Sequence, residues 1–290
     1  MANGDLITGP YEFEFRDTKL GGRTEFAWID SNLANLPDVT TSDLDLIRRH
    51  GELGGSDFHS GRTIDLSFEL SADIGRDGFI EVVRRFRETF VSGTSTSRLY
   101  MSNPAVAAGE KVFIEAVPRA IDLPTDLQFY EGLKVATVRL RAHDPRFYAV
   151  DEGRATGIET PTSIGNRPWV TEWPREWGTT FTSGSFLAVN RGNIDAPMSF
   201  RIDGPCIDPV ILNVDTGEYL RMSASIVAGQ TIEFDMTGTA PVALIAGANG
   251  YHRVSSLSTW LTLAPGSNVF KFSSLDGNGT LSAEWRSTWV

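Results

Sequence analysis

Residues 62–90, RTIDLSFELSADIGRDGFIEVVRRFRETF, contain the two patterns that decide the fold of the first half of the chain. In the first ten residues apolar and polar side chains alternate, as in a β-strand with one buried face and one face in water. From Asp77 apolar residues recur at helical spacing, and Asp77 can cap this helix while Gly93 can end it. The sequence therefore predicts a strand followed by the principal helix of the chain, over residues 77–90. The apolar residues are Ile64, Leu66, Phe68 and Leu70 in the strand, and Phe79, Val82, Val83, Phe86 and Phe90 in the helix.

Further stretches of the first half have the pattern of strands. In residues 11–15 Tyr11, Phe13 and Phe15 alternate with two glutamates, which predicts one buried face and one wet face. Two longer strands are predicted at residues 111–117 and 133–141, and the second of them ends at the turn His143-Asp144-Pro145. We therefore expect an α+β domain over residues 1–150.

The second half is predicted to consist of β-structure alone. From Phe186 onward, short alternating stretches are separated by turn signals that contain glycine, such as Thr216-Gly217 and Asn249-Gly250. This spacing is typical of an antiparallel β-sandwich. The expected fold class is mainly β with one principal helix, and the expected organisation is a domain at residues 1–150, a connecting segment at residues 151–185 and a sandwich at residues 186–290.

The connecting segment contains three large aromatic residues. Trp169, Trp173 and Trp177 lie four residues apart, but Pro168 and Pro174 oppose a continuous helix. Because the exposure of tryptophan to water is costly, we expect this segment to pack against a domain or a neighbouring subunit. The three tryptophans are therefore the candidate interaction residues.

Two carboxylates among these tryptophans leave alternatives open. Glu172 and Glu176 next to aromatic platforms are also typical of glycosidases and of carbohydrate-binding clefts. Aromatic residues are enriched at protein interfaces, so we favour docking over sugar binding. Glycan binding that is lost in Trp173→Ala would favour a carbohydrate-binding adhesion module, and turnover that is lost in Glu172→Gln would favour a glycoside hydrolase.

Charge and composition exclude several classes of protein. The 290 residues carry a net charge of −11, with 37 carboxylates against 26 lysines and arginines, and this charge disfavours binding to phosphate backbones. The arginines on the outer face of the predicted helix are accordingly read as a solvated surface. No stretch approaches the ~18 uninterrupted apolar residues of a membrane helix, and the first ten residues lack a signal-peptide pattern, so neither membrane insertion nor secretion is predicted.

Motifs for catalysis and for metal binding are absent from the sequence. Neither a Gly-x-Ser-x-Gly motif nor a phosphate-binding glycine pattern occurs. Asp57 and His59 lie two residues apart, but a metal site needs further ligands that this spacing does not supply. The single cysteine, Cys206, excludes an intrachain disulfide and a multi-thiolate metal site, and it suits a reducing cytoplasm. We therefore predict no catalytic, cofactor-binding or metal-binding residues, and we do not expect an enzyme.

A family resemblance rests on short motifs in a fixed order. In the second half they are Gly192-Asn193, Ala196-Pro197, Pro209 with Asn213, Thr216-Gly217-Glu218, Pro265-Gly266-Ser267-Asn268, Trp285-Arg286 and Trp289. In the first half they are Gly61-Arg62 and Asp144-Pro145-Arg146-Phe147-Tyr148. With these motifs the second half resembles the C-terminal domain of siphophage distal tail proteins, and the first half resembles their N-terminal domain more loosely.

This resemblance implies a structural protein of a long non-contractile phage tail. It implies a ring-forming belt domain at residues 1–150 and a galectin-like sandwich at residues 186–290, with six copies in a ring between the tail tube and the tail tip or baseplate hub. DNA and the tape measure protein are expected to pass through the central channel. The implied partners are copies of the same chain and the tail tube, tape measure and tail hub proteins. The implied location is the tail tip of the virion, after assembly in the cytoplasm of the host bacterium.

Overall fold

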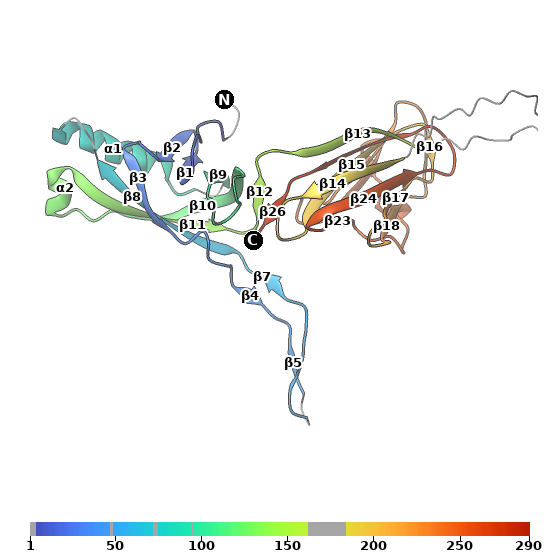
Figure 1. The fold of residues 1–290 in the computed structure, drawn as a ribbon, viewed down its shortest axis with the longest axis horizontal. Coiled ribbons are helices and arrows are strands. Elements are labelled where there is room, and N and C mark those ends of the chain that lie inside the picture. The colour runs from blue at the N-terminus through green and yellow to red at the C-terminus, as the bar shows by residue number, and fades with distance from the viewer. Residues whose placement is uncertain (1–3, 47–48, 72–74, 94, 162–183) are drawn as a thin grey trace, which may run out of the picture. The chain divides into compact units, whose positions relative to one another are not determined.

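The computed structural model describes residues 4–46, 49–71, 75–93, 95–161 and 184–290. It divides into two compact units. Unit 1 consists of Met1–Asp151 together with Thr288–Val290, and unit 2 consists of Glu152–Ser287. Both units are built from antiparallel strands, and the principal helix lies in unit 1 (Figure 1). The expected fold class, mainly β with one principal helix, is confirmed.

Unit 1 combines one large sheet with the principal helix. Its helices are α1 (Gly75–Thr89) and α2 (Leu127–Glu131). Its strands are β1 (Glu12–Phe15), β2 (Thr18–Gly21), β3 (Phe26–Ser31), β4 (Val39–Thr40), β5 (Leu44–Asp45), β6 (Glu52–Leu53), β7 (Phe58–His59), β8 (Arg62–Ser71), β9 (Ser97–Ser102), β10 (Val112–Asp122), β11 (Leu133–Ala142), β12 (Phe147–Ala149) and β26 (Thr288–Trp289).

The sheet of unit 1 has the order β2-β1-β9-β10-β11-β8-β3, and β12 joins it by pairing with β10 and β26. The strand predicted from the alternating residues is β8, which pairs with β11 along its whole length. The predicted helix is α1, which begins at Gly75, two residues before Asp77. Its apolar face packs against the sheet, and the ring of Phe86 lies 5.7, 6.0 and 5.0 Å from those of Phe26, Phe68 and Phe90. This packing forms the core of unit 1.

The prediction that β1 has one face in water is wrong. Glu12 and Glu14 have exposed fractions of only 8% and 4%. The preceding segment covers this face and supplies donors: the N–H groups of Thr8 and Gly9 donate to Glu12 Oε2 at 2.6 and 3.0 Å, and the N–H of Leu6 donates to Glu14 Oε2 at 3.1 Å. The face is buried because these hydrogen bonds replace water, which an alternating pattern cannot reveal.

Glu12 is held ionised by its surroundings. Burial alone raises the pKa of this carboxyl, but hydrogen bonds from Thr8 and Gly9 and the ammonium of Lys19, 2.9 Å away, lower it from the ordinary 4.5 to about 2. A carboxyl whose pKa is lowered by folding stabilises the folded state above its unfolded pKa. That contribution is therefore complete above pH 4.5 and is lost as the pH falls from about 4.5 to about 2.

We predict that Glu12→Gln lowers the free energy of unfolding of unit 1 by about 2–3 kcal/mol at pH 7. The neutral amide cannot replace the charged acceptor of these hydrogen bonds or pair with Lys19. Acid titration of the variant, followed by circular dichroism, should show a shallower loss of stability below pH 4.5 than the wild type. Glu115→Gln, which removes an exposed ion pair with Arg98, is the control and should change stability by less than about 1 kcal/mol. Equal losses in the two variants would contradict the prediction.

Unit 2 is an antiparallel β-sandwich with further small sheets. One sheet has the order β13-β25-β15-β20-β21-β22, with β23 paired to β15, and the facing sheet has the order β14-β24-β17-β18. Inward side chains of both sheets, such as Phe200, Phe234, Phe270 and Phe272, form one core. Its elements are β13 (Gly153–Glu159), β14 (Ser185–Asn190), β15 (Ala196–Asp203), β16 (Cys206–Ile207), β17 (Val210–Asn213), β18 (Tyr219–Arg221), β19 (Ser225–Ile226), β20 (Thr231–Asp235), β21 (Val242–Ile245), β22 (Ala248–Asn249), the 3₁₀ helix η1 (Tyr251–Arg253), β23 (Thr262–Leu263), β24 (Gly266–Ser273) and β25 (Thr280–Trp285).

Part of the expected connecting segment is a strand of the sandwich. β13 pairs with β25, with an irregularity in register between Ala155 and Ile158. Its pattern is hidden in the sequence because small residues replace large apolar ones. At Gly153 an added Cβ would lie 2.4 Å from the ring of Trp285, so this position needs glycine. Close packing at Gly153, and not an alternation of apolar and polar residues, therefore accounts for the residues of this strand.

The end of the chain belongs to unit 1. In β26 Trp289 lies opposite Phe147 of β12, and its side chain is buried in the core of unit 1. Trp285, four residues earlier, is instead part of the core of unit 2. The last residues thus complete the sheet that the first half of the chain begins.

Candidate assembly interface

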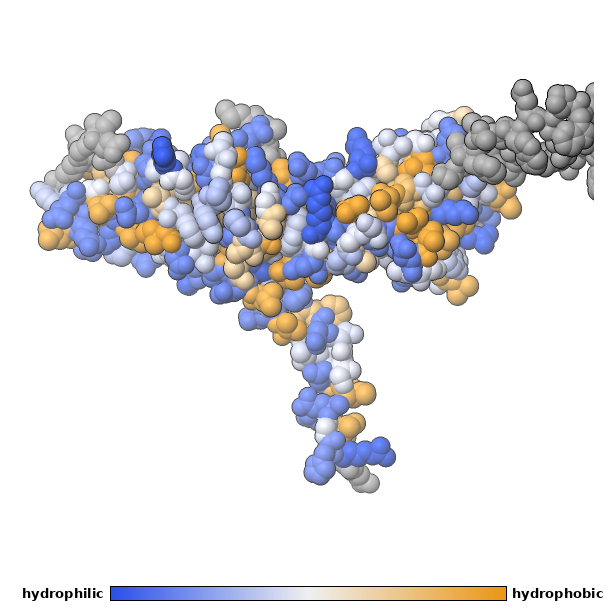
Figure 2. Space-filling view, viewed as in Figure 1, coloured by the Kyte–Doolittle hydropathy of each residue, from blue (hydrophilic) through white to orange (hydrophobic). Residues whose placement is uncertain are grey.

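An exposed two-stranded arm connects β3 to β8. In this arm, residues 34–61, β4 pairs with β7 and β5 pairs with β6 (Figure 1). Six large apolar side chains of the arm have between 41% and 71% of their surface exposed, and Figure 2 shows hydrophobic residues along it. They are Leu36, Val39, Leu44, Leu46, Leu53 and Phe58. An isolated two-stranded ribbon is only marginally stable in water, so this arm is suited to binding a partner.

The outer part of the arm has one apolar face and one acidic face. Leu44 lies opposite Leu53, and the next pair, Asp45 and Glu52, points to the other face. Like charges directly opposite each other destabilise a strand pair. In the sequence, residues 38–59 carry five carboxylates against two arginines. A partner that offers cations and an apolar surface would therefore stabilise the arm.

Arg62 fixes the base of the arm. Its side chain is buried, Nη1 donates to the carbonyl oxygen of Leu33 at 2.7 Å, and the guanidinium lies 4.5 Å from the ring centroid of Phe147. Within the described residues Nε and Nη2 have no hydrogen-bond partner. Burial lowers the pKa of this arginine to about 10, which still leaves it charged at pH 7. The contact between Leu33 and Arg62 joins the two strands at the point where the arm leaves the sheet.

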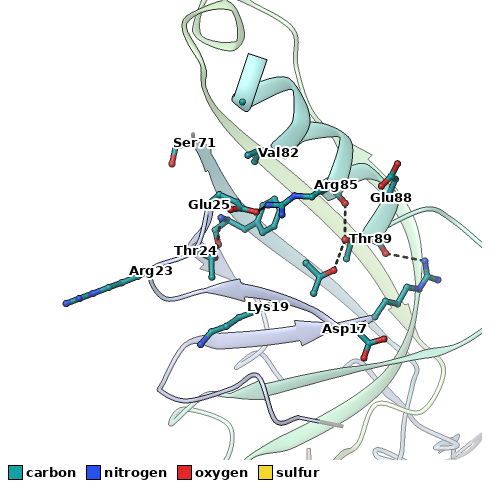
Figure 3. Close-up of a pocket in the computed structure, with 14 residues that line it drawn as sticks. Asp17, Lys19, Arg23, Thr24, Glu25, Ser71, Val82, Arg85, Glu88 and Thr89 are labelled. Carbon is teal, nitrogen blue, oxygen red and sulfur yellow. Dashed lines mark hydrogen bonds and ion pairs between the residues drawn. The ribbon is translucent and has the colours of Figure 1, made fainter. Parts of the chain in front are cut away.

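A second feature is a pocket of about 1180 Å³ between α1 and the turn that joins β2 to β3 (Figure 3). It is slightly larger than the roughly 300–1,000 Å³ of typical small-molecule sites, and it is large enough for side chains of a polypeptide segment. Its apolar lining consists of Phe26 and Val82. Its charged lining residues are the cations Arg16, Lys19, Arg23 and Arg85 and the anions Asp17, Glu25 and Glu88.

The cationic side chains of the pocket differ in whether they already have a partner in the described part of the chain. Arg85 pairs with Glu25 across the pocket, and Lys19 pairs with Glu12. Arg16 donates to the carbonyl oxygens at the end of α1. Arg23 makes no hydrogen bond or ion pair with the described part of the chain, and Figure 3 shows it pointing away from the pocket centre. The rim therefore presents a cation that is free to meet an incoming carboxylate.

The residues proposed from the sequence are placed differently. Trp169, Trp173 and Trp177, and with them Glu172 and Glu176, lie outside the described residues. Asp57 and His59 lie on the exposed arm, and no group of three or more potential metal-ligating side chains occurs among the residues that the structure describes.

The remaining polar and reactive groups have structural surroundings. Asp144 accepts hydrogen bonds from Arg146 and from the hydroxyl of Tyr148, which fixes the turn after β11. Cys206 is buried, and burial raises the pKa of its thiol to about 11. On the outer face of α1, Arg84 pairs with Glu81 and Glu88, as expected for a solvated surface. No helix of the described residues is long and apolar enough to cross a membrane.

Neither the arm nor the pocket is predicted by the sequence. The alternation Asp43-Leu44-Asp45-Leu46 and the glycines Gly51 and Gly54-Gly55 are a signal for a hairpin, but each stretch is only a few residues long. The pocket forms from residues that are distant in sequence, namely the β2–β3 turn and α1. Nothing in the local pattern brings these two segments together.

Comparisons with known proteins find one matching family model and similar solved structures. Residues 191–289 match the family model described as the siphovirus-type tail component, C-terminal domain. The chain is similar to the crystal structure of the Dit protein of phage SPP1, with a TM-score of 0.61 at 9% identity, over 96% of this chain and 99% of that one. That protein is described as a paradigm of the hub adsorption apparatus in phages that infect Gram-positive bacteria.

Weaker similarities extend to baseplate structures. A chain of the phage P2 baseplate in its activated conformation with Ca has a TM-score of 0.45 at 8% identity, over 94% of this chain and 97% of that one. The same baseplate with Sr gives a TM-score of 0.43 at 9% identity, over 93% and 97% of the two chains. No curated protein matches the sequence.

The family match and the fold agree with the resemblance found in the sequence motifs. The family match covers most of unit 2, and the similarity to SPP1 Dit extends over both units. The resemblance is confirmed: residues 191–289 match the C-terminal domain of siphovirus-type tail components, and the chain has the fold of SPP1 Dit.

Proposed function

We propose that this chain is a non-enzymatic distal tail protein of a phage with a long non-contractile tail. The observation that carries this proposal is the family match at residues 191–289 within a chain that resembles SPP1 Dit along almost its whole length. A sequence match in one unit and a fold match that includes the other point to the same class of protein. Function cannot be read from a fold alone, and the sequence match supplies the second line of support.

The proposed form of the protein is a ring of six copies that joins the tail tube to the tail hub. Ring closure requires a heterologous contact, in which one surface of each copy meets a different surface of the next. The exposed arm of unit 1 supports this proposal, because it offers apolar and acidic surface that extends away from the sheet. The tail tube, tape measure and hub proteins are the proposed neighbours of the ring, at the tail tip of the virion after assembly in the host cytoplasm.

The ring is also proposed to let DNA and the tape measure protein pass through its centre. A net charge of −11 per copy repels phosphate groups. DNA would accordingly move through the channel without being held there. A channel surface rich in lysine and arginine would contradict this part of the proposal.

Mass photometry of the purified full-length protein is expected to give a species of about 190 kDa, six times the 31.8 kDa of one chain. Dilution should convert this species into monomers without a stable intermediate, since the closed ring has one contact more than an open chain of the same number of copies. A different closed ring, such as a trimer, would contradict the proposed copy number and leave the adaptor role in place.

The adaptor role itself is tested in virions. Particles produced without this protein are expected to lack complete tails in electron micrographs, and supplying the protein in trans should restore them. Intact tails built without it would overturn the proposed function.

A further inference from the structure

The arm and the α1 pocket lie at opposite ends of the same pair of strands. β3 runs from Phe26, which lines the pocket, to Ser31, next to the arm, and β8 runs from Arg62 at the base of the arm to Ser71 at the pocket. A strand of ten residues spans about 33 Å. Figure 1 shows α1 and β2 near one end of β8 and the arm leaving the other end. The arm of a chain therefore extends away from its own pocket.

The two features are complementary in charge and polarity. The outer arm presents Leu44 and Leu53 on one face and the like-charged pair Asp45 and Glu52 on the other. The pocket lies between α1 and the β2–β3 turn, which the Arg85–Glu25 pair bridges, so that a ribbon docked over this pair meets both sides of the pocket. Its lining carries four cations against three anions, and two of its residues are apolar, Phe26 and Val82.

We propose that the outer arm of one copy, β5 and β6, docks in the α1 pocket of a second copy of this chain. In this contact Arg23 meets the acidic pair that is unfavourable in the free arm, and the arm leucines pack at the mouth of the pocket, above the buried side chains of Phe26 and Val82. A cation beside Asp45 and Glu52 offsets the repulsion between these two carboxylates. The inference rests on the proposed ring, and it names the surfaces that form its repeated contact.

Another exposed apolar surface suits the arm less well. At α2, the side chains of Leu127 and Leu133 are about half exposed or more. The same hairpin carries Asp122, Asp126 and Glu131, which would repel the acidic pair of the arm. The α1 pocket is therefore the better acceptor of these two surfaces.

The opposite placement of arm and pocket also explains why the contact repeats. A copy whose arm is docked still has an empty pocket, and a copy whose pocket is filled still has a free arm. Such a heterologous contact continues from copy to copy until the chain of contacts closes. The geometry of one protomer thus contains both halves of a ring contact.

The test uses full-length variants on each half of the contact. Asp45→Lys with Glu52→Lys alters the arm, and Arg23→Glu alters the pocket, and neither set includes a buried residue. By sedimentation velocity each variant is expected to assemble at least ten-fold more weakly than the wild type. A one-to-one mixture should recover rings in which the two variants alternate, because the wild-type arm of one meets the wild-type pocket of the other and the reversed charges meet at the next contact. Asp38→Lys on the inner arm and Arg87→Glu on the outer face of α1 are matched controls and should assemble as the wild type does.

A photo-crosslinking side chain at position 44 maps the contact directly. The expected crosslinks join this position to residues 16–26 or 82–89 of another copy, as identified by mass spectrometry. Crosslinks to any other segment, or wild-type assembly by the arm and pocket variants, would overturn the docking. Rings that persist in those variants leave the proposed function standing, whereas complete tails without the protein would overturn the proposed function itself.

Discussion

Phe86→Ala is expected to lower the free energy of unfolding of unit 1 by about 3–5 kcal/mol, the range for removing a buried phenylalanine. The ring of Phe86 is fully buried and contacts the rings of Phe26, Phe68 and Phe90. It therefore joins α1 to β3 and β8, and alanine leaves a cavity at the centre of the core. The same helix forms a wall of the α1 pocket, so this loss also loosens the proposed docking surface.

Hydrogen exchange measured by mass spectrometry distinguishes the two units. Amides of β8 and β11 should exchange at least ~100-fold faster in Phe86→Ala, since each 1.4 kcal/mol corresponds to a factor of ten. Amides of β15 and β25 should keep their protection, because the buried residues of unit 2 form a separate core. Ile80→Ala, on the exposed side of α1, is the control and should change stability by about 0.5 kcal/mol or less. Equal protection of β8 in the two variants would contradict the prediction.

The parts of the fold that were predicted correctly are those with a long periodic pattern. Apolar residues alternate over the ten residues of β8 and recur at helical spacing over four turns of α1. In each case many side chains therefore indicate the same type of secondary structure. Glu12 and Glu14 show the opposite case. Their alternation with Phe13 correctly indicates a strand but wrongly predicts a wet face, because a separate segment supplies the hydrogen bonds that satisfy both carboxylates.

The candidate interface could not be predicted in the same way. The arm has strands of two residues, too short for a periodic signal. It is a candidate interface because its apolar side chains are exposed, and only the structure shows that exposure. The pocket depends on a close approach of α1 to the β2–β3 turn, where Arg85 meets Glu25. Both features follow from tertiary packing, whereas the three tryptophans stand out in the sequence by their residue type alone.

Trp289→Ala is expected to destabilise unit 1 by about 3 kcal/mol or more. The indole is buried in the core of unit 1, and Trp289 is the pairing partner of Phe147 in β12. The ring of Phe147 in turn lies beneath the guanidinium of Arg62, which binds the carbonyl oxygen of Leu33. The last strand of the chain, β26, is thereby connected through three contacts to the base of the arm.

This connection makes the effect of Trp289→Ala different from that of Phe86→Ala. Loss of the indole should first speed hydrogen exchange at the amides of β12 and at those beside Leu33 and Arg62. The amides of β8 near Ser71 should keep more of their protection. Trp289→Phe retains an aromatic side chain against β12 and should recover most of the stability. Uniform deprotection of unit 1 in Trp289→Ala would mean that the chain end supports the whole core and not the base of the arm. Since the arm is the proposed ring contact, selective release at its base should weaken assembly before the unit unfolds.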